Sequence, residues 1–231
     1  GSGTCIKRSS KAKWRTNLIF KGDAGMIAII DYGAGNLFSV KNALDFLQKE
    51  STITEDVQEI RKADAMILPG VGAFPDAMRM LNEKGLDKVI CEEAQRKPLL
   101  GICLGMQMLF ETSYEFKETK GLGLLEGSVV PIDGGGLKIP HMGWNNLTIL
   151  NPCKMTEGLK EDAYVYFVHS FRAETKDENI SCYTMYNEKI PALVHKGFVY
   201  GAQFHPEKSG SVGLGLLERF ADLAKIQEEE R

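Results

Sequence analysis

The residues best suited to covalent chemistry lie around Cys103, in the sequence GICLG at residues 101–105. The apolar segment Pro98–Ile102 comes before this cysteine and a helical pattern follows it, which is typical of a nucleophile elbow. Because such a turn brings backbone close to both sides of the nucleophile, glycines are needed two residues away. The start of the helix would favour the thiolate and offer free N–H groups to an oxyanion. We therefore predict a nucleophilic Cys103; the alternative is a buried structural cysteine.

A thiol nucleophile needs a base, and the base needs a group that orients it. His205 and Glu207, in the segment QFHPEK at residues 203–208, could supply both. In extended backbone two residues apart, their side chains would share one face at the C-terminal edge of a strand over Phe198–Phe204. The alternative is a surface histidine beside a solvated glutamate. Three other histidines compete weakly for the role of base: His141, His169 and His195.

A glycine-rich segment, PGVG at residues 69–72, follows the apolar stretch Ala65–Leu68. Closely spaced glycines allow a backbone N–H to turn toward a developing negative oxygen. Together with the N–H of Leu104 this segment would form a two-donor oxyanion hole; the alternative is a plain turn. The residues that we predict for this hole are Gly70, Val71, Gly72 and Leu104.

The pattern of apolar residues differs between the two halves of the chain and indicates which elements position these residues. From Met26 to about residue 111, short apolar runs alternate with helical patterns, including Leu86–Lys97 and Leu104–Glu111, which predicts a parallel sheet with right-handed crossovers. After Gly121, strand-like stretches follow one another without long helices, up to a terminal helix over Leu214–Lys225; the segment at residues 194–197 reads as a turn. We predict an α/β fold: a mostly parallel central sheet flanked by helices, with additional antiparallel strands in the C-terminal half.

Composition and charge exclude several functions. The 231 residues carry a net charge of −3, but residues 1–25 hold six Lys or Arg against one Asp, so the remaining body is acidic and unsuited to tracking nucleic-acid phosphates. No apolar run is long enough to span a membrane. Five cysteines without a CxxC pair suggest reduced thiols in a cytoplasmic protein rather than a metal site.

The sequence also suggests where the functional domain begins. We expect residues 1–25 to be a cloning-derived or disordered leader, with the native start at Met26; a basic targeting arm is the alternative. A single domain would then cover residues 26–231.

Cys103 in its elbow, with His-Pro-Glu downstream, resembles the class I (triad) glutamine amidotransferase family. Three further motifs, DYGAGN at 31–36, PGVG at 69–72 and PHMGWN at 140–145, resemble those of the glutaminase subunits that serve imidazole glycerol phosphate synthases in histidine biosynthesis. The resemblance covers residues 26 to about 225. It implies hydrolysis of L-glutamine to glutamate and ammonia by Cys103, His205 and Glu207, with no metal or organic cofactor.

The resemblance also implies binding residues and a partner. Glutamine would contact Gly72, Gln107, Glu115, Ser170 and Phe171, although family members often have Tyr where Phe171 stands. The alternatives are a solvated Gln107 and a loop-capping Glu115. Ammonia would pass to a (β/α)8-barrel cyclase subunit, and the Pro69–Gly72 segment would act as a switch when that partner engages. The residues implied at the interface are Asn36, His141, Met142, Trp144, Tyr166 and Lys208; for Trp144 the alternative is a core indole on an amphipathic strand.

Three rival functions remain open from the sequence. The first is a glutaminase of the same fold that serves anthranilate, GMP, CTP or pyridoxal phosphate synthesis. The second is a cysteine peptidase-like hydrolase of related fold. The third is a non-enzymatic binding module that retains the elbow as a remnant, which the joint presence of Cys103, His205 and Glu207 disfavours.

Overall fold

An eight-stranded sheet forms the centre of the computed structural model, which describes residues 25–161 and 163–229; the leader expected over residues 1–25 lies outside the described residues except for Gly25. The first five strands in its spatial order pair in parallel, and the remaining pairings are antiparallel. The order across the sheet is β2 (Ser51–Thr54), β1 (Ile27–Ile30), β3 (Ala65–Gly70), β4 (Leu99–Cys103), β14 (Val199–Ala202), β13 (Glu188–Lys196), β12 (Ile180–Tyr186) and β9 (Thr148–Ile149).

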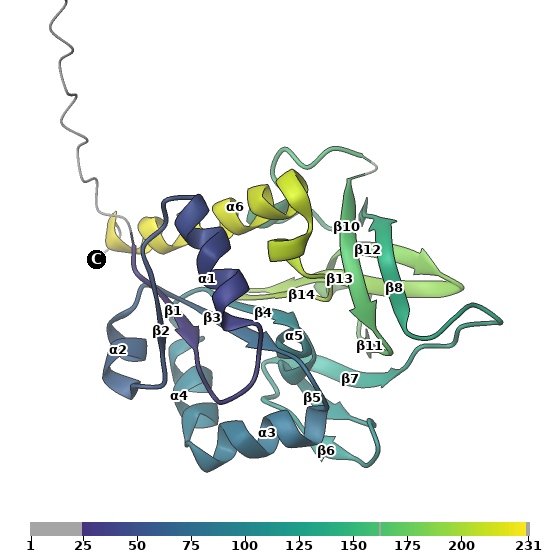
Figure 1. Ribbon diagram of the computed structural model, residues 1–231, viewed down its shortest axis with the longest axis horizontal. Helices are drawn as coiled ribbons and strands as arrows, with labels where there is room; N and C mark the ends of the chain where they lie inside the picture. Colours follow the sequence, from purple (N-terminus) through teal and green to yellow (C-terminus); the bar gives the residue numbers. More distant parts are fainter. Residues whose placement is uncertain (1–24, 162, 230–231) are drawn as a thin grey trace, which may run out of the picture.

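Helices cover both faces of this sheet. Strand β1 contributes to the core on each face. Ile27 and Ile29 belong to the core under α1 and α6, whereas Ala28 and Ile30 belong to the core on the opposite face. Successive side chains of a strand point to opposite faces, so a strand between two helical layers must be apolar throughout. The layers in Figure 1 are α1 (Leu37–Phe46) and α6 (Gly210–Glu229) on one face, and α2 (Val57–Lys62), α3 (Phe74–Glu83) and α4 (Leu86–Glu93) on the other.

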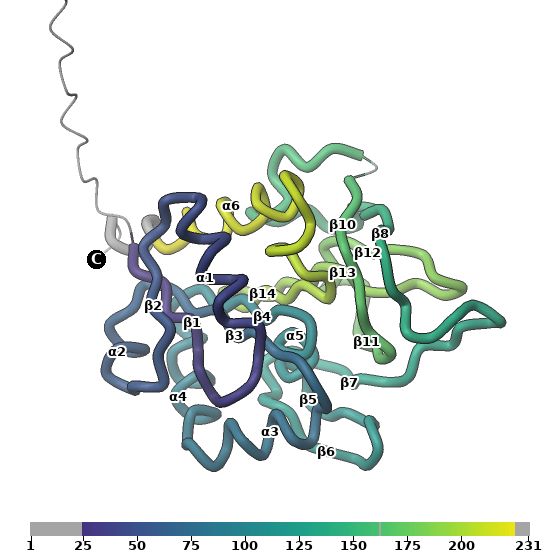
Figure 2. The backbone as a smooth tube through the Cα atoms, in the orientation of Figure 1, coloured from purple at the N-terminus to yellow at the C-terminus, as the bar shows by residue number. Residues whose placement is uncertain are grey.

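Two smaller sheets lie beside the central one, as the backbone trace in Figure 2 shows. A two-stranded antiparallel ribbon pairs β8 (His141–Asn146) with β10 (Tyr164–His169), and places His141 opposite His169. A four-stranded sheet has the order β11 (Phe171–Glu174), β7 (Leu125–Pro131), β5 (Phe110–Ser113) and β6 (Thr119–Lys120). The remaining described elements are the short helix α5 (Leu104–Met108) and three 3₁₀ turns: Lys154–Thr156, Asp177–Asn179 and Pro206–Lys208.

The predicted fold class is confirmed: parallel strands alternate with helices first, and antiparallel strands follow. Several local predictions were wrong. The helix predicted over Leu86–Lys97 ends at Glu93, and the terminal helix predicted to begin at Leu214 begins at Gly210. The helix predicted over Leu104–Glu111 ends at Met108, because Phe110–Ser113 leaves it to pair with β7. The turn predicted at residues 194–197 is strand β13 as far as Lys196, and the chain reverses only at Gly197.

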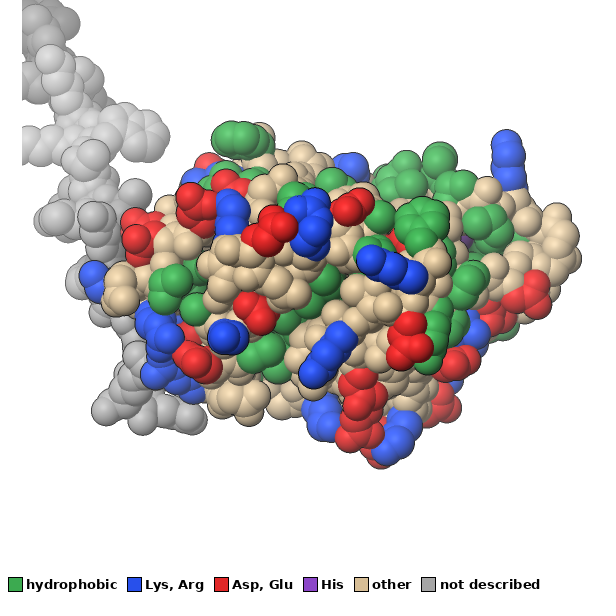
Figure 3. Space-filling model, turned by 90° about the horizontal axis from the view of Figure 1, so that it is seen from below, with side chains coloured by type: hydrophobic (Ala, Val, Ile, Leu, Met, Phe, Trp, Pro, Cys, Tyr) green, Lys and Arg blue, Asp and Glu red, His purple; other side chains and the backbone are tan. Residues whose placement is uncertain are grey.

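Charge on the surface is mixed. In the view from below in Figure 3, Lys and Arg side chains alternate with Asp and Glu across the visible face. On α3, for example, Arg79 pairs with Glu83 at 3.0 Å. Such a face lacks the single-sign field that attracts a phosphate backbone. Among the described residues, no helix is long and apolar enough to cross a membrane, and no three His, Cys, Asp or Glu side chains gather as a potential metal site.

Candidate active site

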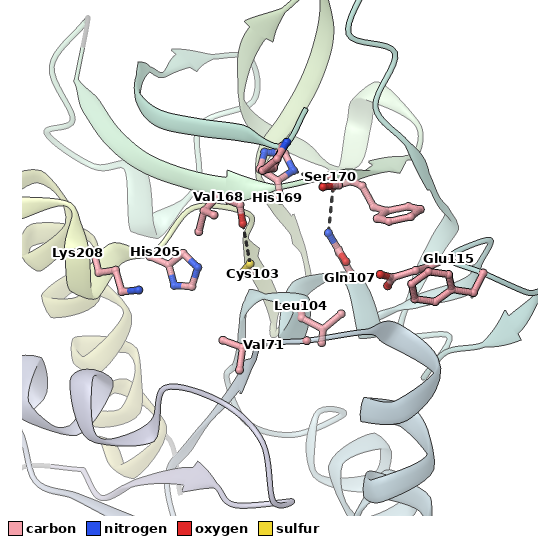
Figure 4. Close-up of a pocket in the computed structure, with 14 residues that line it drawn as sticks. Val71, Cys103, Leu104, Gln107, Glu115, Val168, His169, Ser170, His205 and Lys208 are labelled. Atoms are coloured by element: carbon pink, nitrogen blue, oxygen red, sulfur yellow. Dashed lines mark hydrogen bonds between the residues drawn. The ribbon is translucent and has the colours of Figure 1, made fainter. Parts of the chain in front are cut away.

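A cavity of about 530 Å³ opens at the carboxyl ends of β3 and β4, where ligands commonly bind in open α/β sheets. Figure 4 shows Cys103 near its centre, with His205 and Lys208 to one side and Gln107 and Glu115 to the other. The residues that line it are Val71, Gly72, Cys103, Leu104, Gln107, Glu115, Phe116, Pro140, Val168, His169, Ser170, Phe171, His205 and Lys208.

Cys103 is held in an unusual backbone conformation. It has φ 54° and ψ −110°, and stands immediately before the short helix α5 (Leu104–Met108). A Cβ atom at Gly101 would lie 2.6 Å from the carbonyl oxygen of Gly105, and one at Gly105 would lie 1.8 Å from that of Leu68. Because such distances are sterically impossible, only glycine fits at either position. The surrounding backbone therefore maintains the strain at Cys103.

This packing makes Gly105→Ala strongly destabilising. The added methyl group meets rigid backbone in β3, so we expect the free energy of unfolding to fall by about 3 kcal/mol or more, measured by urea denaturation. Gly215→Ala in α6 is the matched control, since its new methyl group meets the flexible end of Arg219 and alanine favours a helix. A Gly105→Ala protein as stable as wild type would contradict the packing argument.

The Cys103 side chain is almost completely enclosed. Its Sγ atom lies 3.9 Å from the carbonyl oxygen of Val168 and 3.9 Å from Nε2 of Gln203. His205 points toward the sulfur from the other side of the cavity (Figure 4). The thiol of Cys103 on the elbow therefore faces the imidazole of His205.

His205 and Glu207 form a buried pair, with Nδ1 of the imidazole 2.8 Å from Oε1 of the carboxylate. Burial, the largest influence on the imidazole, opposes its charge, but the contacts with Cys103 and Glu207 outweigh burial and raise the pKa of His205 to about 9. The ring therefore carries a proton at neutral pH. The backbone was predicted to be extended from His205 to Glu207, but Glu207 lies in the 3₁₀ turn Pro206–Lys208. This turn, rather than a strand, brings the two side chains together.

The predicted oxyanion segment lies directly beside the elbow. Gly70 pairs with Cys103 in the sheet, and a Cβ atom on Gly70 would lie 2.6 Å from the backbone nitrogen of Gly105. Val71, Gly72 and Leu104 line the cavity, whereas the predicted Gly70 is not among the lining residues. Gly72 has φ 97°, in the region that favours glycine. The segment therefore lies next to Cys103, and within it Gly72 has a conformation that residues other than glycine rarely adopt.

The structure brings the predicted substrate residues to the same cavity. Gln107 is buried rather than solvated, and its Nε2 donates to the carbonyl oxygen of Phe171 and to Oε1 of Gln203, both at 3.1 Å. Glu115 lines the cavity and also caps α3, because its Oε2 accepts the N–H of Phe74 at 2.8 Å. Ser170 lies across the cavity from Leu104 (Figure 4), and Phe171 also lines the cavity.

Sequence reasoning missed several residues of this site. Gln203 is fully buried between Gln107 and Cys103; the available signal was one amide in an otherwise apolar strand end. His169 was named only as a competing base, yet it lines the cavity. Phe116 also lines the cavity, 86% exposed and with φ 60°, and nothing in the sequence pattern singled it out.

The residues expected to meet a partner divide into exposed and buried groups. Met142 and Trp144 on β8 are 60% and 56% exposed, so the indole is not a core residue, and its ring meets the edge of Tyr166 at 6.2 Å. Lys208 is exposed beside the cavity, and Asn36 is half-buried just before α1. His141 requires a correction: it is 2% exposed and stacks inside the protein, so its side chain cannot contact a partner directly.

Comparison with known proteins identifies the class to which this fold and site correspond. The family model for class-I glutamine amidotransferases matches residues 28–222. A solved glutamine amidotransferase superposes with a TM-score of 0.69 and 21% sequence identity, covering 87% of this chain and 100% of the other. The chain therefore belongs to the class-I glutamine amidotransferase family.

Relatives with about 50% sequence identity are subunits of one kind of enzyme. The imidazole glycerol phosphate synthase subunit HisH of Oceanobacillus iheyensis is 51% identical over 202 residues, covering 87% of this chain and all of the relative. The subunit of the same name from Lactococcus lactis is 52% identical over 198 residues, covering 85% of this chain and 98% of the relative. Within its family, the chain is thus similar to HisH subunits along nearly their whole length.

Proposed function

We propose that the chain is the glutaminase subunit of an imidazole glycerol phosphate synthase, which hydrolyses L-glutamine and supplies ammonia for histidine biosynthesis. The observation that carries this proposal is that Cys103 and His205 line one cavity and Glu207 pairs with His205, in a chain about half identical to HisH subunits over almost its full length. We also propose a cytoplasmic location, because the cysteines among the described residues (Cys91, Cys103, Cys153 and Cys182) are all free.

In the first half of the reaction, the Cys103 sulfur attacks the side-chain amide carbon of glutamine as a thiolate. The carbonyl oxygen becomes an oxyanion that accepts hydrogen bonds from backbone N–H groups around Val71, Gly72 and Leu104. His205 then donates a proton to the departing amine, which leaves as ammonia. A proton is available because the pKa of the imidazole is raised to about 9. The product is a thioester between Cys103 and the glutamyl group.

The second half releases glutamate. His205, now neutral, accepts a proton from water, and the resulting hydroxide attacks the thioester carbon. The carbon–sulfur bond breaks and the thiolate and the imidazolium are restored; the new carboxylic acid loses its proton to solvent, and the product leaves as glutamate. Glu207 holds Nδ1 of the ring throughout, which fixes the ring orientation and stabilises its positive charge.

Substrate binding is assigned to the groups around the sulfur. Gln107, Ser170 and Phe171 would hold the backbone end of glutamine, with Glu115 near its ammonium group and Gly72 along its side chain. Glu115 also accepts the N–H of Phe74, so substrate would meet a carboxylate that is already oriented. Such fixed partners reduce the freedom lost on binding.

The ammonia must reach a second subunit, which we propose to be a (β/α)8-barrel cyclase. Free ammonia is protonated in neutral water and loses its nucleophilicity, so a direct contact between subunits benefits the synthase. The exposed apolar side chains Met142 and Trp144 suit the centre of such a contact, and Asn36, Tyr166 and Lys208 would surround them.

This partnership predicts an effect of Trp144→Ala. We expect the dissociation constant for the cyclase subunit to rise by about tenfold or more, because a large exposed aromatic side chain at an interface is a typical anchor. Titration calorimetry would measure the binding, and glutamate release with and without the cyclase would measure the activation. The hydrolysis rate of the isolated subunit should be unchanged.

Phe46→Ala provides the matched control, since Phe46 is 75% exposed at the far end of α1 from Asn36. That variant should bind the cyclase as wild type does. Unaltered binding by Trp144→Ala would remove β8 from the interface. Failure of the wild-type pair to release glutamate from glutamine would refute the proposed function itself.

A further inference from the structure

A chain of hydrogen bonds, buried at its centre between His141 and His169, runs from β8 to the wall of the cavity. Nδ1 of His141 lies 3.0 Å from Nε2 of His169, and Nδ1 of His169 lies 2.8 Å from the carbonyl oxygen of Phe171. At the other end, Nδ2 of Asn145 lies 3.4 Å from Nε2 of His141 and 3.1 Å from the carbonyl oxygen of Met185. The antiparallel register that places His141 opposite His169 creates this line of contacts.

The direction of every bond in the chain follows from its two ends. A carbonyl oxygen can only accept, so Nδ1 of His169 must carry a hydrogen; in a neutral ring its Nε2 is then an acceptor. Nδ1 of His141 must therefore donate, which leaves Nε2 of His141 to accept from the amide of Asn145. Both histidines are thus fixed as the Nδ1–H tautomer.

Packing keeps both rings neutral. His141 is stacked between Phe167, at 4.7 Å between ring centres, and Tyr186, at 4.2 Å. Burial lowers the pKa of His141 to about 4 and is also the main cause that lowers the pKa of His169 to about 3. The donor–acceptor pattern is therefore constant over the pH range in which cells work.

The same carbonyl of Phe171 sets the orientation of Gln107. Because that oxygen only accepts, the group of Gln107 that faces it must be the NH₂, which also donates to Oε1 of Gln203. Both hydrogens of Gln107 are then in use, and its Oε1 is the group that remains to meet a ligand. Gln203 in turn directs its own NH₂ toward the Cys103 sulfur, at 3.9 Å.

We propose that His141 and His169 are positioning residues: their fixed donor chain holds the Phe171 carbonyl, which orients Gln107 so that Oε1 accepts a hydrogen bond from the substrate. This inference rests on the proposed glutaminase function and adds two residues to it. Neither ring touches the reacting atoms in this role. Their effect is on how well the cavity holds glutamine, and so on KM more than on kcat.

Two substitutions of His141 separate this role from general packing. His141→Leu removes the donor and leaves Nε2 of His169 buried without a partner, so we expect KM for glutamine to rise about tenfold with kcat changed less than about threefold. His141→Asn places an amide NH₂ where Nδ1 stood, and should keep KM within about threefold of wild type. Steady-state glutamate release in the presence of the cyclase would measure both.

His195→Asn is the control, because His195 bonds to Gly197 and stacks on Tyr200 outside the cavity, so both constants should stay at wild-type values. Unchanged KM in His141→Leu would overturn the proposal. Equal loss of activity in the Leu and Asn variants would also overturn it, because a packing defect would then explain the effect.

A spectroscopic measurement covers the case in which His141→Leu does not fold. Nitrogen-15 NMR of the wild-type protein should show both rings as the Nδ1–H tautomer from pH 6 to 8, with a scalar coupling between Nδ1 of His141 and Nε2 of His169. The Nε2–H tautomer for either ring would overturn the proposal. A wild-type protein without glutaminase activity would refute the proposed function, whereas this spectrum would still test the hydrogen-bond chain.

Discussion

Replacing Cys103 with alanine should reduce glutamine hydrolysis by about 10⁴-fold or more while the protein stays folded. The reason is that no other described side chain stands on a strained elbow facing His205, so the thioester cannot form without this sulfur. Glutamate release in the presence of the cyclase would measure the activity. The midpoint of urea unfolding should fall only in part, because alanine keeps the Cβ atom but removes one of the contacts that raise the pKa of His205 and so stabilise its charged form.

Cys91→Ala removes the same atom from a different place and serves as the control. Cys91 lies in α4, where its thiol is 3.6 Å from the carbonyl oxygen of Leu122, outside the cavity. The Cys91→Ala variant should therefore hydrolyse glutamine at the wild-type rate. If Cys103→Ala kept a tenth or more of the wild-type rate, the nucleophile would have to be another group, and the proposed mechanism would be abandoned.

The elbow was predictable because its determinants are local. An apolar strand, two glycines and a cysteine within a few residues are sufficient to recognise it. Only part of the steric reason is local: a Cβ atom at Gly101 would meet the backbone of Gly105, whereas one at Gly105 would meet that of Leu68 in the neighbouring strand β3. The parallel sheet was predictable for a similar reason, since residues buried on both faces form short apolar runs, as in β1.

The remainder of the site depends on contacts between distant residues. The contact of Gln107 with Gln203 joins residues 96 positions apart, and no local pattern encodes which amide meets which. The burial of His141 depends on β8 pairing with β10 and on two aromatic rings from β10 and β12. The early end of α5 has the same origin, because tertiary pairing with β7 prevails over the local helical pattern.

The second large effect concerns the pair of His205 and Glu207. We expect Glu207→Gln to reduce glutamine hydrolysis by about 10²- to 10⁴-fold, because an amide stabilises the imidazolium less and can hold the wrong tautomer. It should also lower the pKa of His205 from about 9, since hydrogen bonding and charge from Glu207 are among the causes that raise it. Glutamate release at pH 7 and NMR titration of the ring would measure the two effects.

The raised pKa also makes stability depend on pH. The folded-state pKa of His205, about 9, exceeds the ordinary value of 6.5, so protonation stabilises the folded protein. This contribution is fully present below pH 6.5 and is lost as the pH rises through 9. We expect wild type to lose about 3 kcal/mol of unfolding free energy between pH 6 and pH 9.5 relative to His205→Asn, measured by urea denaturation at both values.

His195 offers a control of opposite sign. Burial is the main cause that lowers the pKa of His195, so this ring in its charged form destabilises the folded protein. Relative to His195→Asn, wild type should therefore become less stable as the pH falls below 6.5. Glu207→Gln should show a smaller loss than wild type between pH 6 and pH 9.5. A loss equal to that of wild type would mean that Glu207 does not support the charge on His205, and would leave Glu207 without its role in the triad.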